Sequence, residues 1–145
     1  MDATQVDVVL DGLVSRLRAA VPNAEVIDGQ PVATSQPEVL VVGWSANRVA
    51  VEIVQTRPDM TRDRRHETLS IVCLASSARG ETESTQVARA NAVALLEQVK
   101  ATLAADRRLG GIVRRAQLGL AMSLDQAQGD GAAATIEFTI DVTTL

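Results

Sequence analysis

Cysteine, histidine and aromatic residues are nearly absent from this 145-residue sequence, which has one cysteine, one histidine, one tryptophan, one phenylalanine and no tyrosine. A single cysteine excludes a disulfide framework and a cysteine-rich zinc site. Cys73 lies within a strand-like apolar run, so we expect a buried, inert thiol. The scarcity of aromatic rings argues against a surface that stacks the bases of single-stranded nucleic acid.

Long apolar runs and a strong charge of one sign are also lacking. The longest apolar stretches, 38–43 and 118–122, are far shorter than the roughly 18 residues of a transmembrane helix. The first twelve residues are acidic and amphipathic, unlike the basic-then-apolar order of a signal peptide. We therefore expect a soluble chain that is cytoplasmic when made and has no membrane partner. Its net charge of −4 predicts no overall attraction to nucleic acid.

Two stretches carry apolar residues at three- and four-residue intervals, the spacing of an amphipathic helix. The first runs from about residue 3 to residue 20, where Asp2 or Thr4 can cap its start, and the second begins near Ser84. Gly110 and Gly111 follow the second helix and predict a left-handed cap at its end. The expected buried stripes are Val6, Leu10, Leu13, Leu17 and Ala20 in the first helix and Ala88, Ala92, Leu95, Leu96, Val99 and Leu103 in the second.

Runs rich in β-branched or alternating apolar residues, bounded by turn residues, predict the strands. The expected strands are 25–27, 38–42, 49–55, 68–76, 112–124 and 135–143. We expect 38–42 and 49–55 to form a hairpin through residues 43–47, and 112–124 to form one continuous strand with an alternating apolar face. An amphipathic helix must bury its apolar face against another element. The sequence therefore predicts a single α+β domain over residues 1–145, a two-layer, largely antiparallel β-sheet with two amphipathic helices packed on one face.

No catalytic or cofactor-binding motif is present. The single histidine, His66, stands beside the carboxylates Asp63 and Glu67, whereas zinc and catalytic sites normally gather several His or Cys ligands. Weak binding of a hard cation by Asp59 and Asp63 is the remaining metal alternative. The double glycine follows a helix, whereas glycine-rich phosphate loops precede one. We therefore predict no enzymatic activity, no cofactor and no metal site.

The most polar segment, 56–67, interleaves arginines with acids. Its net charge is far less one-sided than that of surfaces that track phosphates. A mixed-charge loop suits a salt-bridged protein interface, in which charge complementarity selects the partner, and a solvated loop or a nucleic-acid contact are the alternatives. Trp44 is a further candidate, either as an interface anchor or, as we prefer, closing one edge of the core. The candidate interface residues are Trp44, Arg57, Asp59, Arg62, Asp63, Arg64, Arg65 and His66.

With these patterns the chain resembles the tail terminator proteins of long-tailed bacteriophages, also called tail completion or minor tail proteins of the neck. The resemblance is one of pattern over nearly the whole length. Its parts are the opening helix VDVVLDGLVSRLRAAV, the arginine-led strand RRHETLSIVCLAS, Arg89-Ala90 near the start of the second helix, the exit LGGIVRRAQL and the alternating terminal strand.

This resemblance implies a non-enzymatic structural protein of the virion that forms a homo-oligomeric ring, expected to be a hexamer, in the tail neck. Such rings cap the head-proximal end of the tail tube, stop its polymerisation and dock onto the head connector, while DNA passes through the lumen. The implied partners are further copies of the chain, the tail tube protein and a head-completion or connector protein, with assembly in the host cytoplasm. Another neck or tube component (a head-closure or tail-tube protein) is the first alternative, and a small cytosolic ligand-binding domain is the second.

Overall fold

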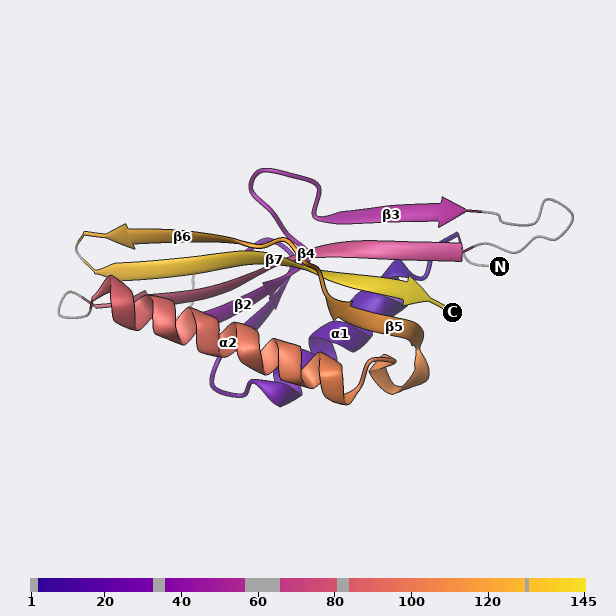
Figure 1. The fold of residues 1–145 in the computed structure, drawn as a ribbon, viewed down its shortest axis with the longest axis horizontal. Coiled ribbons are helices and arrows are strands. Elements are labelled where there is room, and N and C mark those ends of the chain that lie inside the picture. Colours follow the sequence, from indigo (N-terminus) through magenta and orange to yellow (C-terminus); the bar gives the residue numbers. More distant parts are fainter. Residues whose placement is uncertain (1–2, 33–35, 57–65, 81–83, 130) are drawn as a thin grey trace, which may run out of the picture.

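The computed structural model describes residues 3–32, 36–56, 66–80, 84–129 and 131–145 (Figure 1). In chain order the elements are α1 (Val6–Ala20), β1 (Glu25–Asp28), β2 (Glu38–Val42), β3 (Val51–Thr56), β4 (His66–Arg79), α2 (Thr85–Ala105), the 3-10 turn η1 (Leu109–Gly111), β5 (Val113–Leu118), β6 (Ser123–Gln128) and β7 (Ala132–Thr144). The predicted α+β class is confirmed, with two helices and a seven-stranded, mostly antiparallel sheet.

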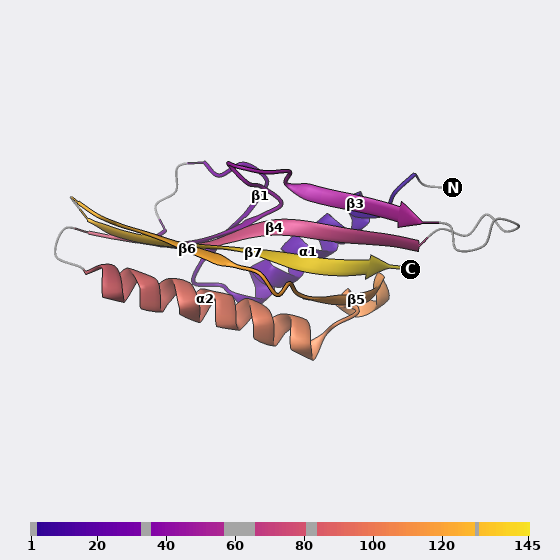
Figure 2. The ribbon, with the colours of Figure 1, turned by 45° about the horizontal axis from the view of Figure 1, so that its top comes forward.

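Two long strands, β4 and β7, form the centre of the sheet and pair antiparallel along nearly their whole length. Each is flanked on its other edge by two shorter strands lying end to end, β2 and β3 beside β4, and β5 and β6 beside β7. β1 extends the sheet beyond β2 through a parallel pairing. Figure 2 shows β3 and β5 at opposite edges of the β4–β7 pair.

The hairpin predicted between 38–42 and 49–55 is wrong, although both strands exist. β2 pairs antiparallel with residues 73–77 of β4, and β3 pairs antiparallel with residues 66–71 of the same strand. The two strands therefore run in the same direction, one after the other, along a single edge of β4. This arrangement is accessible because β4 is 14 residues long, well beyond the predicted 68–76.

The single strand predicted over 112–124 is also wrong, because the chain leaves the ladder at residues 119–122. β5 ends at Leu118 and β6 begins at Ser123, and the Gly119 N–H donates to the Thr139 carbonyl at the break. Leu120 is fully exposed and Met122 is half-exposed. The predicted alternating face is therefore interrupted between two collinear strands that share β7 as their partner.

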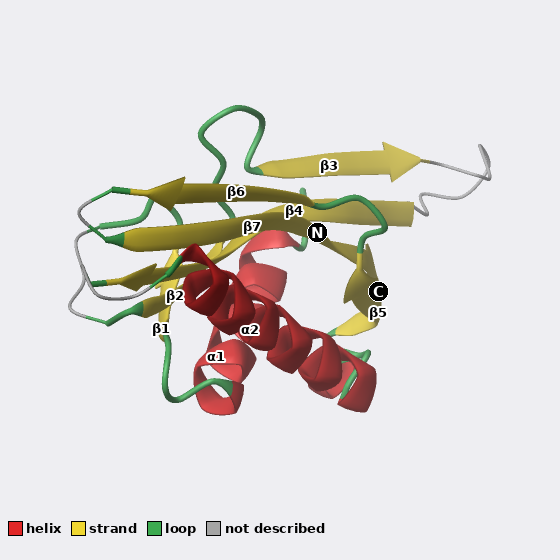
Figure 3. Cartoon of the chain, turned by 60° about the vertical axis from the view of Figure 1, so that its left-hand side comes forward, coloured by secondary structure: helices red, strands yellow, loops and turns green. Residues whose placement is uncertain are grey.

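Both helices lie on the same face of the sheet (Figure 3). The buried residues of α2 are those predicted: Ala88, Ala92, Leu95, Leu96, Val99 and Leu103. Ser84 is its N-cap, with its hydroxyl accepting from the Val87 N–H at 3.3 Å, as expected for a serine at this position. The buried residues of α1 are Val9, Leu13, Val14 and Leu17, so only part of the predicted stripe is correct. Neither described helix is long and apolar enough to cross a membrane.

A carboxylate from the sheet anchors the start of α1. Gln5 is the N-cap residue and its side chain makes no cap hydrogen bond, although the Thr4 hydroxyl accepts from the Val6 N–H at 3.2 Å. Glu67 of β4 is 5% exposed, and its Oε1 accepts from the Gln5 N–H at 2.9 Å. A carboxylate at this end is favoured by the helix dipole. The alternative cap, Asp2, lies outside the described residues.

The buried side chains of both helices and of the strands beneath them form one continuous core. The inward residues predicted for the last strand, Ile136, Phe138, Ile140 and Val142, are buried in β7. Cys73 is fully buried in β4, which confirms the prediction of a buried thiol. Burial raises the pKa of the Cys73 thiol to about 12, because the thiolate is poorly solvated in an apolar interior.

Candidate interaction surface

The sheet face turned away from the helices is here called the open face. Alternation along each strand buries one set of side chains in the core and directs the other set to this face. The open-face residues of β4 and β7 are Thr68, Ser70, Val72, Leu74, Ser76, Thr135, Glu137, Thr139, Asp141 and Thr143. Most of them carry hydroxyl or carboxyl groups, so this face is suited to polar contacts with a partner.

One end of the open face contains a depression of roughly 290 Å³ built from two rows of side chains across four strands. Strand pairing sets the order of each row, which is Glu52, Ser70, Asp141 and Gln117 in the first and Val54, Thr68, Thr143 and Arg115 in the second. Within the described part of the chain, the side chains of Glu52, Asp141 and Arg115 make no hydrogen bond or ion pair. These charged groups are therefore open to a partner of complementary charge.

The loop of residues 43–50, between β2 and β3, covers the open face at its other end. The Ser45 hydroxyl donates to Glu137 Oε1 at 2.9 Å, and Arg48 Nε lies 3.6 Å from Glu137 Oε2. Trp44 and Leu74 line a second depression there, of roughly 230 Å³. Trp44 is partly buried and does not belong to the core, which corrects our preference for a core-edge role. Its role as an interface anchor stays a prediction.

The structure does not bring His66 and Trp44 together. His66 is exposed and pairs with Thr56 at the start of β4, whereas Trp44 lies beside Leu74, further along the same strand. The remaining interface candidates lie outside the described residues; they are Arg57, Asp59, Arg62, Asp63, Arg64 and Arg65. The alternative of a weak cation site at Asp59 and Asp63 lies outside them too. Among the described residues no group of three His, Cys, Asp or Glu side chains is placed to hold a metal ion.

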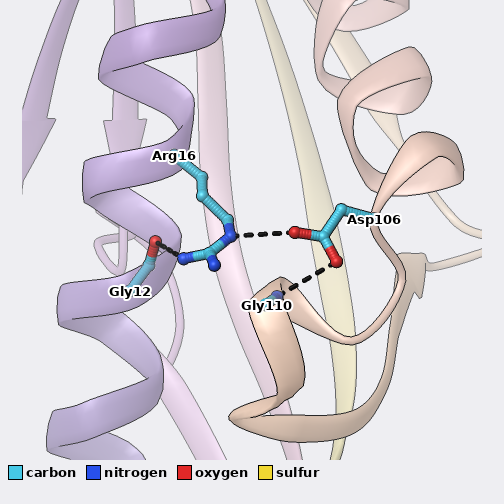
Figure 4. A network of polar contacts seen from close by, with 4 residues as sticks. All are labelled: Gly12, Arg16, Asp106 and Gly110. Carbon is cyan, nitrogen blue, oxygen red and sulfur yellow. Dashed lines mark hydrogen bonds and ion pairs between the residues drawn. The ribbon is translucent and has the colours of Figure 1, made fainter.

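The double glycine lies in a turn whose first amide is already engaged (Figure 4). Gly110 and Gly111 adopt the positive φ angles predicted for them, but they lie in η1, beyond the C-cap of α2 at Asp106. Asp106 Oδ1 accepts from the Gly110 N–H at 3.0 Å, and its Oδ2 accepts from Arg16 Nε of α1 at 3.0 Å. These two contacts lower the pKa of the Asp106 carboxyl, that of Gly110 most strongly. Through Asp106, the turn and the end of α2 are held against Arg16 of α1. Because the Gly110 amide is already used in this contact, the turn offers no anion site.

Sequence reasoning did not find the charged depression of Glu52, Asp141 and Arg115. Each occupies an alternating strand position, the one signal that marks an outward side chain. Their grouping depends on the register of four strands, and two of those strands, β3 and β5, were expected in different pairings or lengths. Glu67 was likewise seen only as a neighbour of His66, because a buried carboxylate has no local sequence pattern.

The chemical groups of the described surface can be stated directly. His66 is exposed at one end of β4, Cys73 is buried, and the two open-face depressions hold carboxylates and one guanidinium. The sequence matches no protein-family model and no curated protein.

Proposed function

We propose that this chain is a structural protein of a bacteriophage tail neck, a tail terminator. It forms a homo-oligomeric ring, a hexamer in our proposal, that caps the head-proximal end of the tail tube and stops polymerisation. The ring joins the tail to the head connector and lets DNA pass. The observation that carries the proposal is the distribution of exposed surface: the two-layer domain leaves the part of the polar sheet face outside the 43–50 loop, and strands on both sides of the sheet, available for contacts.

The charge of the open face supports a conduit. The side chains lining its two depressions include four acids, Glu52, Asp125, Glu137 and Asp141, and one basic residue, Arg115. A surface of this sign does not retain the phosphate backbone, because binding to nucleic acid depends on neutralising phosphates with Lys and Arg. DNA can therefore pass such a surface without being held. A ring is the expected assembly, because contacts between two different patches of identical subunits close when the rotation between them fits a whole number of copies.

Other readings of the fold make different predictions. A tail-tube protein would polymerise into long tubes alone, and a head-closure protein would bind the connector without capping tubes. A small ligand-binding domain would enclose its ligand, as small-molecule sites do. The depressions described above are instead spread over a sheet surface.

The test is tube length. A tail tube protein from the same phage genome would be polymerised with and without this chain, and tube lengths would be measured by negative-stain electron microscopy. We expect long, heterogeneous tubes alone and tubes of regulated length, each with a ring at one end, when the chain is present. Tubes whose lengths do not respond to the chain would rule out a terminator.

The polar segment is tested in the same assay. We propose that Arg62, Arg64 and Arg65 contact a neighbouring subunit or an axial partner, so the triple substitution to alanine should impair ring assembly or head–tail joining. The matched control replaces Arg107, Arg108 and Arg114, three other arginines close together in the sequence. Normal rings and normal joining by the first variant would remove the segment from the interface.

A further inference from the structure

Two strands of equal length, β3 and β6, have outer edges that pair with no other described strand, and they lie on opposite sides of the sheet. β3 and β6 have six residues each, and among the described residues β3 pairs only with β4 and β6 only with β7. Every residue of β6 is exposed, and so is every residue of β3 after Val51. The outer edge of each strand therefore presents backbone N–H and C=O groups that can pair with another strand.

These edges lack most of the features that protect a strand from pairing, and each carries one charged residue, Glu52 in β3 and Asp125 in β6. Neither VEIVQT nor SLDQAQ contains proline, lysine or arginine, and neither pairing contains a bulge. Both strands expose large apolar side chains, Ile53 at 42% and Val54 at 44% in β3, and Leu124 at 43% in β6. Met122, just before β6, is 50% exposed. Such strands are covered in a working protein, because an exposed apolar edge is an aggregation site.

Strand direction indicates what covers them. β3 is antiparallel to β4, β4 is antiparallel to β7, and β7 is antiparallel to β6, so β3 and β6 of one chain point in opposite directions. When a second copy continues the sheet, its β3 consequently lies antiparallel to the β6 it adjoins. Antiparallel pairing needs no further rearrangement of either strand. The two edges of this chain thus fit one another across copies.

We propose that β3 of one copy pairs antiparallel with β6 of the next and extends the sheet from copy to copy. This inference rests on the proposed function, since it specifies the contact that closes the ring. With the two strands fully overlapped, Ile53 and Leu124 lie on the helix side of the joined sheet, as their partners Leu69 and Ile136 do. Glu52 and Asp125 lie on the open face, and in this register they are not directly opposite, which avoids a like-charge pair.

The positions of the two edges also fix how neighbours are offset. β3 lies beside residues 66–71 of β4, whereas β6 lies beside the part of β7 that pairs with residues 74–79 of β4. The strands are thus displaced by about eight residues along the sheet, or roughly 26 Å at about 3.3 Å per residue. Closed sheets accommodate a regular offset by tilting their strands relative to the axis. We expect tilted strands in the ring.

Disulfide trapping tests the pairing. The chain carrying Val54→Cys and Asp125→Cys would be oxidised and run on denaturing gels. Positions 54 and 125 both face the open side, so the paired edges should yield a ladder of linked chains on the gel. The amount of linked chain should be about tenfold greater than in a control whose two cysteines lie on opposite faces of the sheet. That control is Val54→Cys with Gln126→Cys, because Gln126 lies on the helix side. Ser123→Cys and Ala127→Cys replace Asp125→Cys in parallel variants and cover registers shifted by two residues.

The possible results distinguish a failure of the proposed strand pairing from a failure of the proposed ring. A ladder from position 123, 125 or 127 and none from 126 supports the inference. Linked dimers from Val54→Cys alone or Asp125→Cys alone would show like edges meeting and would overturn it. A ring by light scattering with no ladder from any variant would also overturn it, while leaving the proposed function intact. A monomer by light scattering would overturn both.

Discussion

At the scale of single residues, Gly110 is the position where backbone conformation and packing restrict the choice of side chain most. Its φ of +71° lies in the left-handed region that favours glycine, and a Cβ there would overlap the Arg16 guanidinium. That guanidinium is held by Asp106 and also donates to the Gly12 carbonyl at 3.5 Å. The turn after α2 and the middle of α1 are thereby fixed to each other through four residues.

Gly110→Ala is therefore expected to lower the free energy of unfolding by about 1–3 kcal/mol, because it adds backbone strain and displaces Arg16. Gly80→Ala is the matched control. A Cβ at Gly80 meets nothing within 4 Å and its φ is outside the left-handed region, so its stability should be unchanged or slightly raised. Urea unfolding of the three proteins measures the difference. Equal losses in both variants would contradict this account of the turn.

Because Cys73 is buried, we expect the free energy of unfolding to fall as pH rises in the alkaline range. The folded thiol keeps its proton up to a pKa of about 12, whereas the unfolded thiol loses it above the ordinary value of 9.0. Between these values the unfolded state binds fewer protons, so stability falls as pH rises, by about 1.4 kcal/mol per pH unit. Few other groups titrate there, since the sequence has no tyrosine and only Lys100 as a lysine.

From pH 8.5 to 10.5, the wild-type chain should lose about 2 kcal/mol more stability than Cys73→Ala. The variant starts from a lower stability because it leaves a cavity, so the slope with pH is the informative quantity. Urea unfolding at the two pH values gives both slopes. Parallel slopes would mean that the thiol is not protected from ionisation in the folded chain.

At the scale of elements, local sequence patterns predicted whether each segment forms a helix or a strand. Its position in the sheet depends on pairing with segments distant in the sequence. The buried stripe of α2 is entirely as predicted, because helical periodicity is contained within the helix itself. The existence of the strands was predictable for the same reason. Their partners were not, because β2 and β3 share one edge of β4 only when a 14-residue strand is available to both.

The candidate surface shows the same division. Trp44 and His66 could be selected from the sequence as unusual residue types, but their separation along β4 follows from tertiary pairing. Glu52, Asp141 and Arg115 are ordinary charged strand residues, and only the register of four strands places them around one depression. Such a group becomes visible when the sheet order is known.

The start of α1 depends on a contact between elements. Replacing Glu67 by alanine leaves the Gln5 N–H and the Gln55 amide without the carboxylate acceptor that each now uses, so we expect a loss of about 1–3 kcal/mol. Thr68→Ala is the matched control, because Thr68 is the adjacent residue and is exposed on the open face. Its effect should stay within about 0.5 kcal/mol.

Hydrogen exchange separates this mechanism from general destabilisation. The amides in the first turn of α1 should exchange faster in Glu67→Ala, while those of β7 keep the protection expected from the global stability. A variant as stable as the Thr68→Ala control would show that Glu67 does not anchor the helix.

At the scale of the whole molecule, the helix side of the sheet is buried and the other side is partly exposed. The helices and the inner face of β4 and β7 form one continuous core, while the open face and the outer edges of β3 and β6 carry the exposed contact groups. The core therefore holds in place the sheet face and the strand edges that, in our proposal, a further copy of the chain covers. In our proposal, copies of this chain cover these surfaces by assembling into a closed ring.

The mass of the purified chain in solution, measured by size-exclusion chromatography with light scattering, tests that claim most directly. One chain weighs 15.3 kDa, so a hexameric ring should give a single species of about 92 kDa whose mass does not grow as concentration rises, because a closed ring has no free ends to add copies. A stable species of 15.3 kDa would contradict the account.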